Sequence, residues 1–507
     1  MTDITLHFYD YSHVFVETND AVFKELKDQL SFFVDGYQFH PKFKYGTWSG
    51  KISLLDNDRL LPIGLVDHLV KYATNNSLSI GVHDKVKHKN PITRSEFTEW
   101  AESKKYYSGS DEIFPYWYQM DAVFESLSNK RRILNLPTSA GKSLIQALLA
   151  KYMIEKTDRS VLILVPTVSL VNQMKDDFVD YRLFEHDEIA EVYSTKKSKT
   201  KESIQNKRIV VSTWQSAIKK PQEWFNQFGM LLCDEMHLAI GKSISTIIKK
   251  LSYCEYKIGL SGSLRDGKAN LMQYVGLFGG IYNPTTTAEL MDNGQVSKLR
   301  INALFLKYPE NVSKAMNDMD YASEIKFITK LQKRTNWVSK LAYKLSSKNE
   351  NVFVMFKHIE HGKQIYDTLK NMGHEKIYYV SGEVNAELRN ELKKIAEVDS
   401  GVIIIASYGV FSTGISVKNL HHVVLAHPVK SKVIVLQTIG RVLRKHGSKS
   451  IAQLWDLIDD MSTTVDKNGI KHRKNVNYAL KHGIERIERY GIERFDYIMK
   501  DVDFLKQ

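Results

Sequence analysis

A short loop of small residues is the first feature of the sequence that could do chemistry. Residues 137–143 read Pro-Thr-Ser-Ala-Gly-Lys-Ser and stand between an apolar run at 132–136 and a helical pattern at 144–154. The backbone N–H groups of such a loop wrap a phosphate at the start of the helix, where the helix dipole also favours an anion. Lys142 is expected to reach the β- and γ-phosphates of a nucleotide, and Ser143 is expected to ligate its Mg²⁺.

The backbone of this loop is the expected phosphate cradle. The residues concerned, besides Lys142 and Ser143, are Thr138, Ser139, Ala140 and Gly141. Leu136 stands where such loops usually begin with glycine, so the context of strand, loop and helix carries the prediction. The alternative is the start of a helix that a serine caps.

Two adjacent carboxylates follow an apolar run at 231–233. Asp234 and Glu235 gain nothing from packing at the end of a buried strand, so their position indicates a cation. Asp234 is expected to hold the Mg²⁺ of a nucleotide, and Glu235 to orient and deprotonate an attacking water. Such a pair is a weak signal alone, because Asp-Glu pairs also occur on solvated turns. Its place after a phosphate loop favours the catalytic interpretation.

Two arginines lie three residues apart in the last quarter of the chain. Arg441 and Arg444 follow Gln437, and their spacing predicts that both lie on one face of a helix. Guanidinium groups so arranged stabilise charge on a γ-phosphate during phosphoryl transfer. A basic helix that touches only solvent is the alternative.

A loop at 40–51 mixes basic and aromatic residues and contains no acidic residue. Lysines hold phosphates while aromatic faces stack on bases, so the loop could bind nucleic acid. The residues expected to do so are Lys42, Lys44, Tyr45 and Trp48. A hairpin whose aromatic side chains pack inward explains the same pattern, and the sequence leaves both interpretations open.

The elements that must position these groups form two series. Apolar, β-rich runs that alternate with helical patterns lie at 132–136, 161–165, 209–212, 230–233 and 257–260, and again at 352–356, 377–380, 402–406 and 423–426. This is the pattern of parallel sheets flanked by helices, so we expect two α/β lobes. The expected domains are a small α+β domain at 1–90, a first lobe at 91–290, a second lobe at 291–462 and a basic helical C-terminal segment at 463–507.

Composition limits the class of protein and its partners. The chain has 507 residues, of which 43% are hydrophobic and 25% charged, as in ordinary globular proteins of two to four domains. Lys and Arg number 71 against 58 Asp and Glu, and the net charge of +13 would attract a polyanion such as nucleic acid or an acidic lipid surface. Cys233 and Cys254 cannot supply a disulfide framework, so reduced thiols are expected.

The sequence predicts no membrane span and no secretory signal. The longest apolar runs, such as 161–165 and 402–406, are far shorter than the ~20 residues that a bilayer-spanning helix needs. The first ten residues include Asp3 and Asp10, without a basic stretch that leads into a hydrophobic segment. A cytoplasmic protein is therefore expected.

Several short segments, taken in order, resemble the motifs of the superfamily 2 DExH helicases and translocases. They lie at 118–119, 137–143, 165–173, 211–215, 234–237, 259–263, 356–358, 407–417 and 437–444. The pieces are individually weak, but their joint order over residues 110–460 is specific, and the resemblance implies a core of two RecA-like lobes. The segment 36–46, the phosphate loop and residues 437–445 are similar, more narrowly, to phage recombination and repair helicases.

The resemblance implies an activity and assigns roles to residues. The implied protein is an ATP-dependent DNA helicase or translocase that unwinds or branch-migrates forks, Holliday junctions, D-loops and RNA–DNA hybrids. In it Gln119 recognises adenine, while Ser261 and Ser263 couple the ATP site to the strand. Gln437, Arg441 and Arg444 sense the γ-phosphate from the second lobe. Pro166, Thr167, Thr213, Lys357 and Thr413 fall in segments that track the nucleic-acid backbone.

Other functions stay open at this point. An RNA helicase or the motor subunit of a restriction complex would share these motifs, although no nuclease constellation follows residue 460. A non-catalytic, basic DNA-binding scaffold is a third possibility, against which the full set of nucleotide-binding residues argues. Ser416 stands where many members of the superfamily have an acid, so a ribose contact there is not implied.

Overall fold

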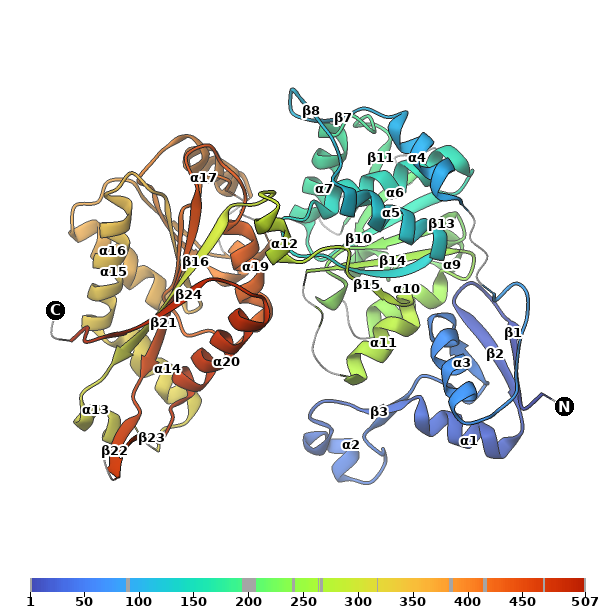
Figure 1. The fold of residues 1–507 in the computed structure, drawn as a ribbon, viewed down its shortest axis with the longest axis horizontal. Coiled ribbons are helices and arrows are strands. Elements are labelled where there is room, and N and C mark those ends of the chain that lie inside the picture. Colours follow the sequence, from blue (N-terminus) through green and yellow to red (C-terminus); the bar gives the residue numbers. More distant parts are fainter. Residues whose placement is uncertain are drawn as a thin grey trace. The chain divides into compact units, whose positions relative to one another are not determined.

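The protein is described by a computed structural model, in which the chain divides into two compact units. The structure describes residues 2–87, 92–193, 207–238, 242–262, 264, 268–316, 318–382, 386–413, 417–467 and 470–505. One unit comprises residues 1–136 and 141–284, and the other comprises residues 285–507 together with 137–140. Figure 1 shows the chain coloured along its sequence.

The N-terminal part of the first unit is a small α+β domain around a four-stranded sheet. Its strands β1 (Ile4–Phe8), β2 (His13–Thr18), β5 (Leu60–Pro62) and β6 (Ile80–Val82) are arranged in the order β5-β2-β1-β6. β1 pairs antiparallel with β2 and parallel with β6. Alternate residues of β1 and β2 are buried, because one face of the sheet is covered by α1 (Asp20–Gln29) and α3 (Val66–Asn75).

A separate two-stranded sheet belongs to the same domain, and we call residues 31–53 the aromatic extension. β3 (Ser31–Phe33) and β4 (Lys51–Ser53) pair antiparallel. The chain between them contains the 3-10 turn η1 (Tyr37–Phe39) and α2 (Pro41–Lys44). Figure 1 shows α2 lying apart from β1 and β2.

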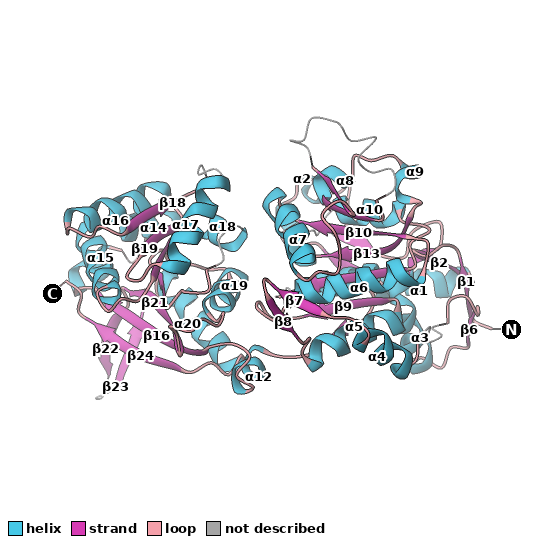
Figure 2. Cartoon of the chain, turned by 90° about the horizontal axis from the view of Figure 1, so that it is seen from above, coloured by secondary structure: helices cyan, strands magenta, loops and turns pink. Residues whose placement is uncertain are grey.

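The first lobe is built on a seven-stranded parallel sheet in the order β11-β12-β10-β13-β14-β9-β15. The strands are β9 (Arg131–Asn135), β10 (Ser160–Val165), β11 (Ile189–Val192), β12 (Ile209–Thr213), β13 (Phe228–Cys233), β14 (Tyr256–Ser261) and β15 (Ile281–Tyr282). β10 and β13 are buried at every position, since helices cover both faces of the sheet (Figure 2). For this reason they read as unbroken apolar runs in the sequence.

Helices of the first lobe pack in two layers. The helices are α4 (Arg94–Glu102), α5 (Trp117–Asn129), α6 (Lys142–Lys156), α7 (Val168–Asp180), α8 (Trp214–Ala217), α9 (Gln222–Phe225), α10 (Lys242–Lys250) and α11 (Lys268–Phe278). Side chains from α8, α10 and α11 join one core with Leu162 and Leu164 of β10. α5, α6 and α7 pack against one another on the other face. The hairpin of β7 (Tyr106–Ser108) and β8 (Asp111–Ile113) precedes α5.

The small domain is fixed to the first lobe by buried polar contacts and by a close backbone approach. The Tyr11 carbonyl accepts hydrogen bonds from Lys257 Nζ at 2.7 Å and from Arg131 Nη2 at 3.0 Å, and both cations are buried. Gly64 lies so near α11 that a Cβ atom there would stand 2.1 Å from the Val275 carbonyl oxygen. The two parts therefore contact one another directly and belong to one compact unit.

The second lobe repeats the strand order of the first with its own seven parallel strands, β18-β19-β17-β20-β21-β16-β24. They are β16 (Lys298–Lys307), β17 (Val352–Phe356), β18 (Ile377–Val380), β19 (Ile403–Ser407), β20 (His422–Leu425), β21 (Ile451–Asp460) and β24 (Tyr497–Val502). The helices are α12 (Thr287–Asp292), α13 (Glu310–Ala315), α14 (Tyr321–Lys330), α15 (Gln332–Ser346), α16 (Ile359–Asn371), α17 (Ala386–Val398), α18 (Tyr408–Thr413), α19 (Lys432–Val442) and α20 (Tyr478–Ile492). The expected class, two parallel-sheet lobes with a small α+β domain, is confirmed.

The expectation of a helical C-terminal segment at 463–507 is wrong. The segment begins with a hairpin of β22 (Thr463–Lys467) and β23 (Ile470–Lys474), continues into α20 and ends in β24. β24 pairs with β16 over six residues, and Leu480 of α20 packs on Ile458 and Phe305. Since the strand completes the sheet and the helix covers it, residues 478–502 are an integral part of the second lobe.

Within the described residues, no helix combines the length and the apolar composition needed to cross a bilayer.

Candidate active site and nucleic-acid-binding residues

The phosphate loop has the backbone conformation that an anion cradle requires. It leaves β9 after Asn135 and enters α6 at Lys142, with Ser139 and Gly141 in the left-handed region at φ 74° and 73°. A Cβ atom at Gly141 would lie 2.2 Å from Gln119 Nε2, so only glycine fits there. No side chain caps the start of α6, which leaves the N-terminal N–H groups of the helix for a ligand.

Gln119 lies directly beside this loop, as its expected role requires. The residue is buried in the first turn of α5, and its Oε1 atom accepts a hydrogen bond from the Tyr116 N–H at 2.8 Å. That bond fixes the amide, whose nitrogen is the atom nearest to Gly141. The structure thus brings Gln119 together with the phosphate loop, which lies about twenty residues further along the chain.

The two carboxylates follow β13 and reach the same part of the first lobe. Lys142 Nζ lies 3.5 Å from Glu235 Oε1, and Glu235 has a left-handed backbone conformation with φ 46°. The Asp234 N–H donates to the Leu164 carbonyl at 2.9 Å, which holds the end of β13 against β10. A non-glycine residue with positive φ is costly, and such strain clusters at functional sites.

Asp234 fits the role of a cation ligand. Its side chain is buried, and its Oδ1 atom has no hydrogen-bond partner among the residues that the structure describes. Burial raises the pKa of Asp234, the neighbouring Glu235 raises it further, and Lys142 opposes both effects. A buried carboxylate oxygen without a partner is costly, whereas carboxylate and hydroxyl oxygens are suitable ligands for Mg²⁺.

A Mg²⁺ ion at this place would need further oxygen ligands from outside the protein. Among the described residues, no group of three or more His, Cys, Asp or Glu side chains could hold a metal ion. Asp234 and the Ser143 hydroxyl are therefore suited to an ion that arrives with the phosphates and with water, as Mg²⁺ usually does.

A histidine links the Glu235 carboxylate to the end of the next strand. His237 Nδ1 lies 3.3 Å from Glu235 Oε2 and 2.9 Å from Ser261 Oγ. The Tyr274 hydroxyl donates to the His237 carbonyl at 3.1 Å and so restrains the backbone of the histidine. Ser261, which only the family resemblance had singled out, thus contacts the catalytic cluster through one side chain. Ser263 lies outside the described residues.

The predicted backbone-tracking residues of the first lobe lie at the carboxyl ends of two neighbouring strands. Pro166 and Thr167 follow β10, and Thr167 caps α7 by accepting the Leu170 N–H at 3.4 Å. Thr213 ends β12, where it is buried and its hydroxyl donates to Ser216 Oγ at 3.0 Å. Thr167 is the more accessible of the two threonines.

In the second lobe, the helix that carries the predicted sensors is shorter than expected. α19 carries Gln437 and Arg441 and ends at Val442, so Arg444 lies two residues beyond it. At this end of the helix the buried Lys449 Nζ donates to the Val442 carbonyl at 2.7 Å. Arg441 places its guanidinium 5.6 Å from the centre of the Phe411 ring.

The remaining predicted residues of the second lobe are only partly described. Lys357 follows β17 and is exposed. Thr413 is the last residue of α18, but its side chain lies outside the described part of the structure, as does Ser416.

In the aromatic extension, some aromatic rings pack against one another and others face solvent. Tyr37 stacks on Phe33 and meets Phe43 edge to face, while Trp48 contacts His40 and donates its Nε1–H to the Lys51 carbonyl at 2.8 Å. These rings build the extension.

Two other rings of the extension face solvent. Phe39 is 79% exposed and Tyr45 is 82% exposed, and Lys42 and Lys44 are exposed on α2 between them. Tyr45 is therefore available to a base, as predicted, whereas Trp48 is held in the fold of the extension.

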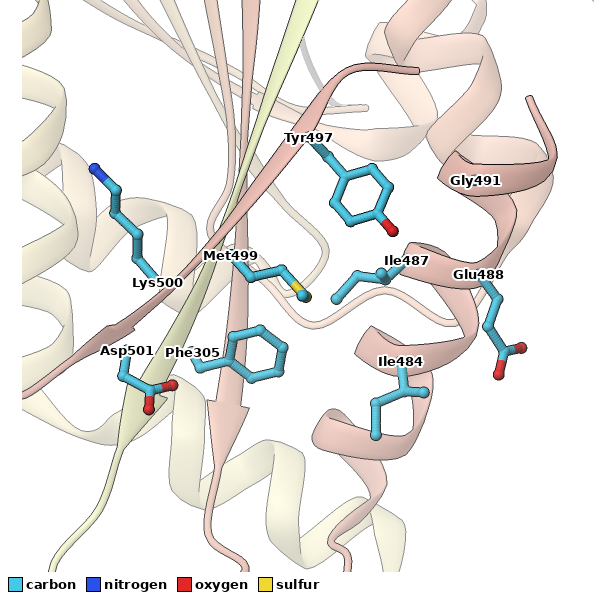
Figure 3. Close-up of a pocket in the computed structure, with 9 residues that line it drawn as sticks. All are labelled: Phe305, Ile484, Ile487, Glu488, Gly491, Tyr497, Met499, Lys500 and Asp501. Atoms are coloured by element: carbon cyan, nitrogen blue, oxygen red, sulfur yellow. The ribbon is translucent and has the colours of Figure 1, made fainter. Parts of the chain in front are cut away.

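A cavity of the second lobe is unrelated to these residues. It lies between α20 and β24, and Figure 3 shows Ile487 and Met499 pointing toward one another across it. Its other apolar lining comes from Phe305, Ile484 and Tyr497. None of the predicted site residues lines this cavity.

The sequence did not predict three residues that the structure brings to these sites. They are Phe39, His237 in its bridging position, and Tyr181, whose hydroxyl lies 2.7 Å from Ser143 Oγ. No local signal marks Tyr181, because its contact joins residues 38 positions apart.

Family models match three consecutive parts of the chain. Residues 3–83 match the model described as DNA helicase UvsW, N-terminal; residues 112–266 match Type III restriction enzyme, res subunit; and residues 333–446 match Helicase conserved C-terminal domain. With the nucleotide-binding geometry, these matches define a two-lobed helicase core that carries an additional N-terminal domain.

One relative is similar along the whole chain. The ATP-dependent DNA helicase uvsW of Enterobacteria phage T4 is 56% identical over 502 residues, which cover 99% of this chain and 100% of that protein. The crystal structure of T4 UvsW is 54% identical in sequence, with a TM-score of 0.55, and covers 99% of this chain and 100% of that one. A second structure of the UvsW helicase from bacteriophage T4, 52% identical with a TM-score of 0.54, covers 56% of this chain and all of its own. The chain belongs to the UvsW helicase family.

Proposed function

We propose that the chain uses ATP hydrolysis to unwind or branch-migrate branched DNA, such as forks, Holliday junctions and D-loops, and to unwind RNA–DNA hybrids. The observation that carries the proposal is the cluster of Lys142, Asp234 and Glu235 in the first lobe of a chain that is 56% identical to a DNA helicase. The geometry supports phosphoryl transfer, and the relationship supports the coupling of that chemistry to DNA.

Each group of the cluster has a distinct task in the proposed reaction. The loop backbone and Lys142 bind the phosphates, and Gln119 contributes the adenine contact from beside the loop. Asp234 and Ser143 hold Mg²⁺, which when bound neutralises charge on the phosphate oxygens. Glu235 accepts the proton of the attacking water.

Other residues of both lobes assist hydrolysis in this proposal. His237 restrains the Glu235 carboxylate and connects it to Ser261 at the end of β14. A displacement of Ser261 therefore also moves Glu235, the proposed general base. Gln437, Arg441 and Arg444 are the proposed γ-phosphate sensors of the second lobe.

Nucleic acid is bound by backbone contacts and by stacking. The proposed backbone contacts are made by Pro166, Thr167, Thr213, Lys357 and Thr413. In the aromatic extension, Tyr45 and Phe39 stack on bases while Lys42 and Lys44 bind phosphates. Trp48, which also supports the fold of the extension through its bond to the Lys51 carbonyl, belongs to the same proposed binding surface.

The catalytic assignment is tested with Lys142→Ala. Removing the ammonium group takes away a charge that faces the transferred phosphoryl, so DNA-stimulated ATP hydrolysis should fall by about 10²–10³-fold or more. Steady-state ATPase assays with fork DNA, Holliday junctions, duplex DNA and single-stranded RNA measure the effect. The matched control is Lys151→Ala on the same helix, which should hydrolyse ATP normally. Normal turnover by Lys142→Ala contradicts the assignment, and stimulation by RNA alone contradicts the DNA substrate.

The nucleic-acid surface is tested with the double variant Phe39→Ala with Tyr45→Ala. Each stacked base contributes roughly 1–3 kcal/mol, so the affinity for a Holliday junction should fall by about 10-fold or more while nucleotide affinity stays constant. Fluorescence anisotropy with labelled junctions measures it. Tyr9→Ala removes another exposed ring of the same domain, outside the extension, and serves as the control. Equal junction affinity in the double variant would move this role elsewhere.

A further inference from the structure

The hydroxyl of Ser143 has a protein partner that the proposed reaction does not use. Ser143 is the second residue of α6, and its Oγ atom lies 2.7 Å from the phenolic oxygen of Tyr181. Tyr181 is the residue that ends α7. The contact therefore joins the start of the helix after the phosphate loop to the end of the next helix.

Tyr181 is held in place through its backbone. Its N–H donates to the Asp177 carbonyl at 3.0 Å, and its carbonyl accepts from the Tyr107 N–H at 3.4 Å. The preceding residue, Asp180, accepts the Gly109 N–H at 2.8 Å through its carboxylate. The hairpin of β7 and β8 thus holds the backbone at the end of α7.

A serine hydroxyl that ligates Mg²⁺ must present a lone pair to the ion. It has one proton and two lone pairs, so donation of the proton to a fixed acceptor determines where the lone pairs point. The Ser143 and Tyr181 hydroxyls lie at hydrogen-bond distance and either can donate; the arrangement that orients the metal ligand is the one in which Ser143 donates and Tyr181 accepts. Partners of metal ligands commonly fix the ligand's orientation in this way.

We propose that Tyr181 is a positioning residue for the Mg²⁺ of the bound nucleotide, acting through the orientation of the Ser143 hydroxyl. The inference rests on the proposed function, in which Ser143 is a Mg²⁺ ligand. It assigns to Tyr181 a role in metal-dependent nucleotide affinity.

The same helix connects this position to a nucleic-acid-binding residue. α7 begins after Thr167, which caps it, and ends at Tyr181, a rigid span of 13 residues or about 20 Å. Nucleic acid that shifts the first turn of α7 displaces Tyr181 as well, because a helix transmits movement along its axis. DNA contact at Thr167 thereby changes the affinity for Mg²⁺-bound nucleotide.

The test is Tyr181→Phe, which removes the acceptor oxygen and keeps the ring. Titration of the full-length protein with a fluorescent ADP analogue, in Mg²⁺ and in EDTA, measures nucleotide affinity without turnover. We expect affinity about 10-fold weaker than that of the unmodified protein in Mg²⁺, and equal affinity in EDTA. Tyr152→Phe, which removes a hydroxyl from the same helix as Ser143 at a distance of nine residues, should match the unmodified protein in both conditions.

Several outcomes would overturn the inference. Equal weakening in Mg²⁺ and in EDTA would show a structural role only, and unchanged affinity in Mg²⁺ would show no role. In a Ser143→Ala background Tyr181→Phe should have no further effect, and an additive loss would contradict action through Ser143. Fork DNA should change the Mg²⁺-dependent affinity of the unmodified protein more than that of Tyr181→Phe, and an equal change in both would overturn the link through α7.

The titrations in Mg²⁺ and in EDTA also distinguish a failure of the inference from a failure of the proposed function. If the unmodified protein binds nucleotide equally in Mg²⁺ and in EDTA, the assignment of Ser143 fails, and the inference fails with it. If Mg²⁺ strengthens binding equally in the unmodified protein and in Tyr181→Phe, the inference about Tyr181 alone is wrong.

Discussion

The two lobes share one strand order, but their buried carboxylates differ in how completely they are hydrogen-bonded. In the first lobe, Asp234 follows β13 with one oxygen lacking a hydrogen-bond partner. In the second lobe, Asp459 on β21 receives two hydrogen bonds from the fully buried Arg334, at 2.7 and 2.9 Å, and a third from the Tyr308 hydroxyl at 2.7 Å. Both carboxylates are buried, but their charges are compensated differently.

The same compensation recurs along β21. Asp456 accepts two hydrogen bonds from Arg486, at 2.9 and 2.7 Å, and a third from the Tyr490 hydroxyl at 2.8 Å. Asp460, at the end of the strand, pairs with Lys307 at 2.6 Å. Two lobes with the same fold can therefore differ in their suitability for chemistry. The first lobe, whose Asp234 is incompletely paired, is the one suited to receive a cation.

The largest effect expected from this contrast concerns the second lobe. Asp459→Asn leaves the buried Arg334 without its counter-charge, so stability should fall by about 3–5 kcal/mol. Chemical denaturation followed by circular dichroism measures the loss. Asp501→Asn is the matched control, because that carboxylate is 66% exposed beside Lys307 and should change stability little. An unchanged unfolding midpoint for Asp459→Asn would contradict the claim that the Asp459 charge is needed to compensate Arg334.

A smaller effect of opposite sign is expected in the first lobe. An acid whose folded pKa is raised, as burial raises that of Asp234, destabilises the protein above that pKa, and the penalty disappears below the unfolded value of about 3.9. Asp234→Asn should therefore raise the melting temperature of the nucleotide-free protein at pH 8, by roughly 2–4 °C for about 1 kcal/mol, and by less at pH 5. Differential scanning fluorimetry in EDTA measures both shifts. A lower melting temperature at pH 8 would mean that Asp234 is compensated like Asp459.

Elements with strong local patterns were predictable from the sequence. β10, β13, β17 and β18 are continuous apolar runs, and their bounds agree with the expected ones within two residues. The phosphate loop and Asp234 with Glu235 were found because short-range sequence defines them. Lys142 and Glu235 then lie close together because both follow strands of one parallel sheet.

Features that depend on tertiary contacts could not be predicted. β24 reads Tyr-Ile-Met-Lys-Asp-Val, which is too polar to indicate a buried strand, because it is the edge strand of its sheet. The end of α19 before Arg444 lies at a contact with Lys449, seven residues further along the chain than Val442. Which rings of the aromatic extension face solvent depends on contacts such as that between Trp48 and His40.

The attachment of the small domain has a mechanical consequence. Because Lys257 and Arg131 donate hydrogen bonds to the Tyr11 carbonyl and Gly64 lies against α11, the small domain is held directly on the sheet that α6 covers. Under the proposed function, a base stacked on Tyr45 and Phe39 would therefore be held by the same compact unit that carries Lys142, Asp234 and Glu235.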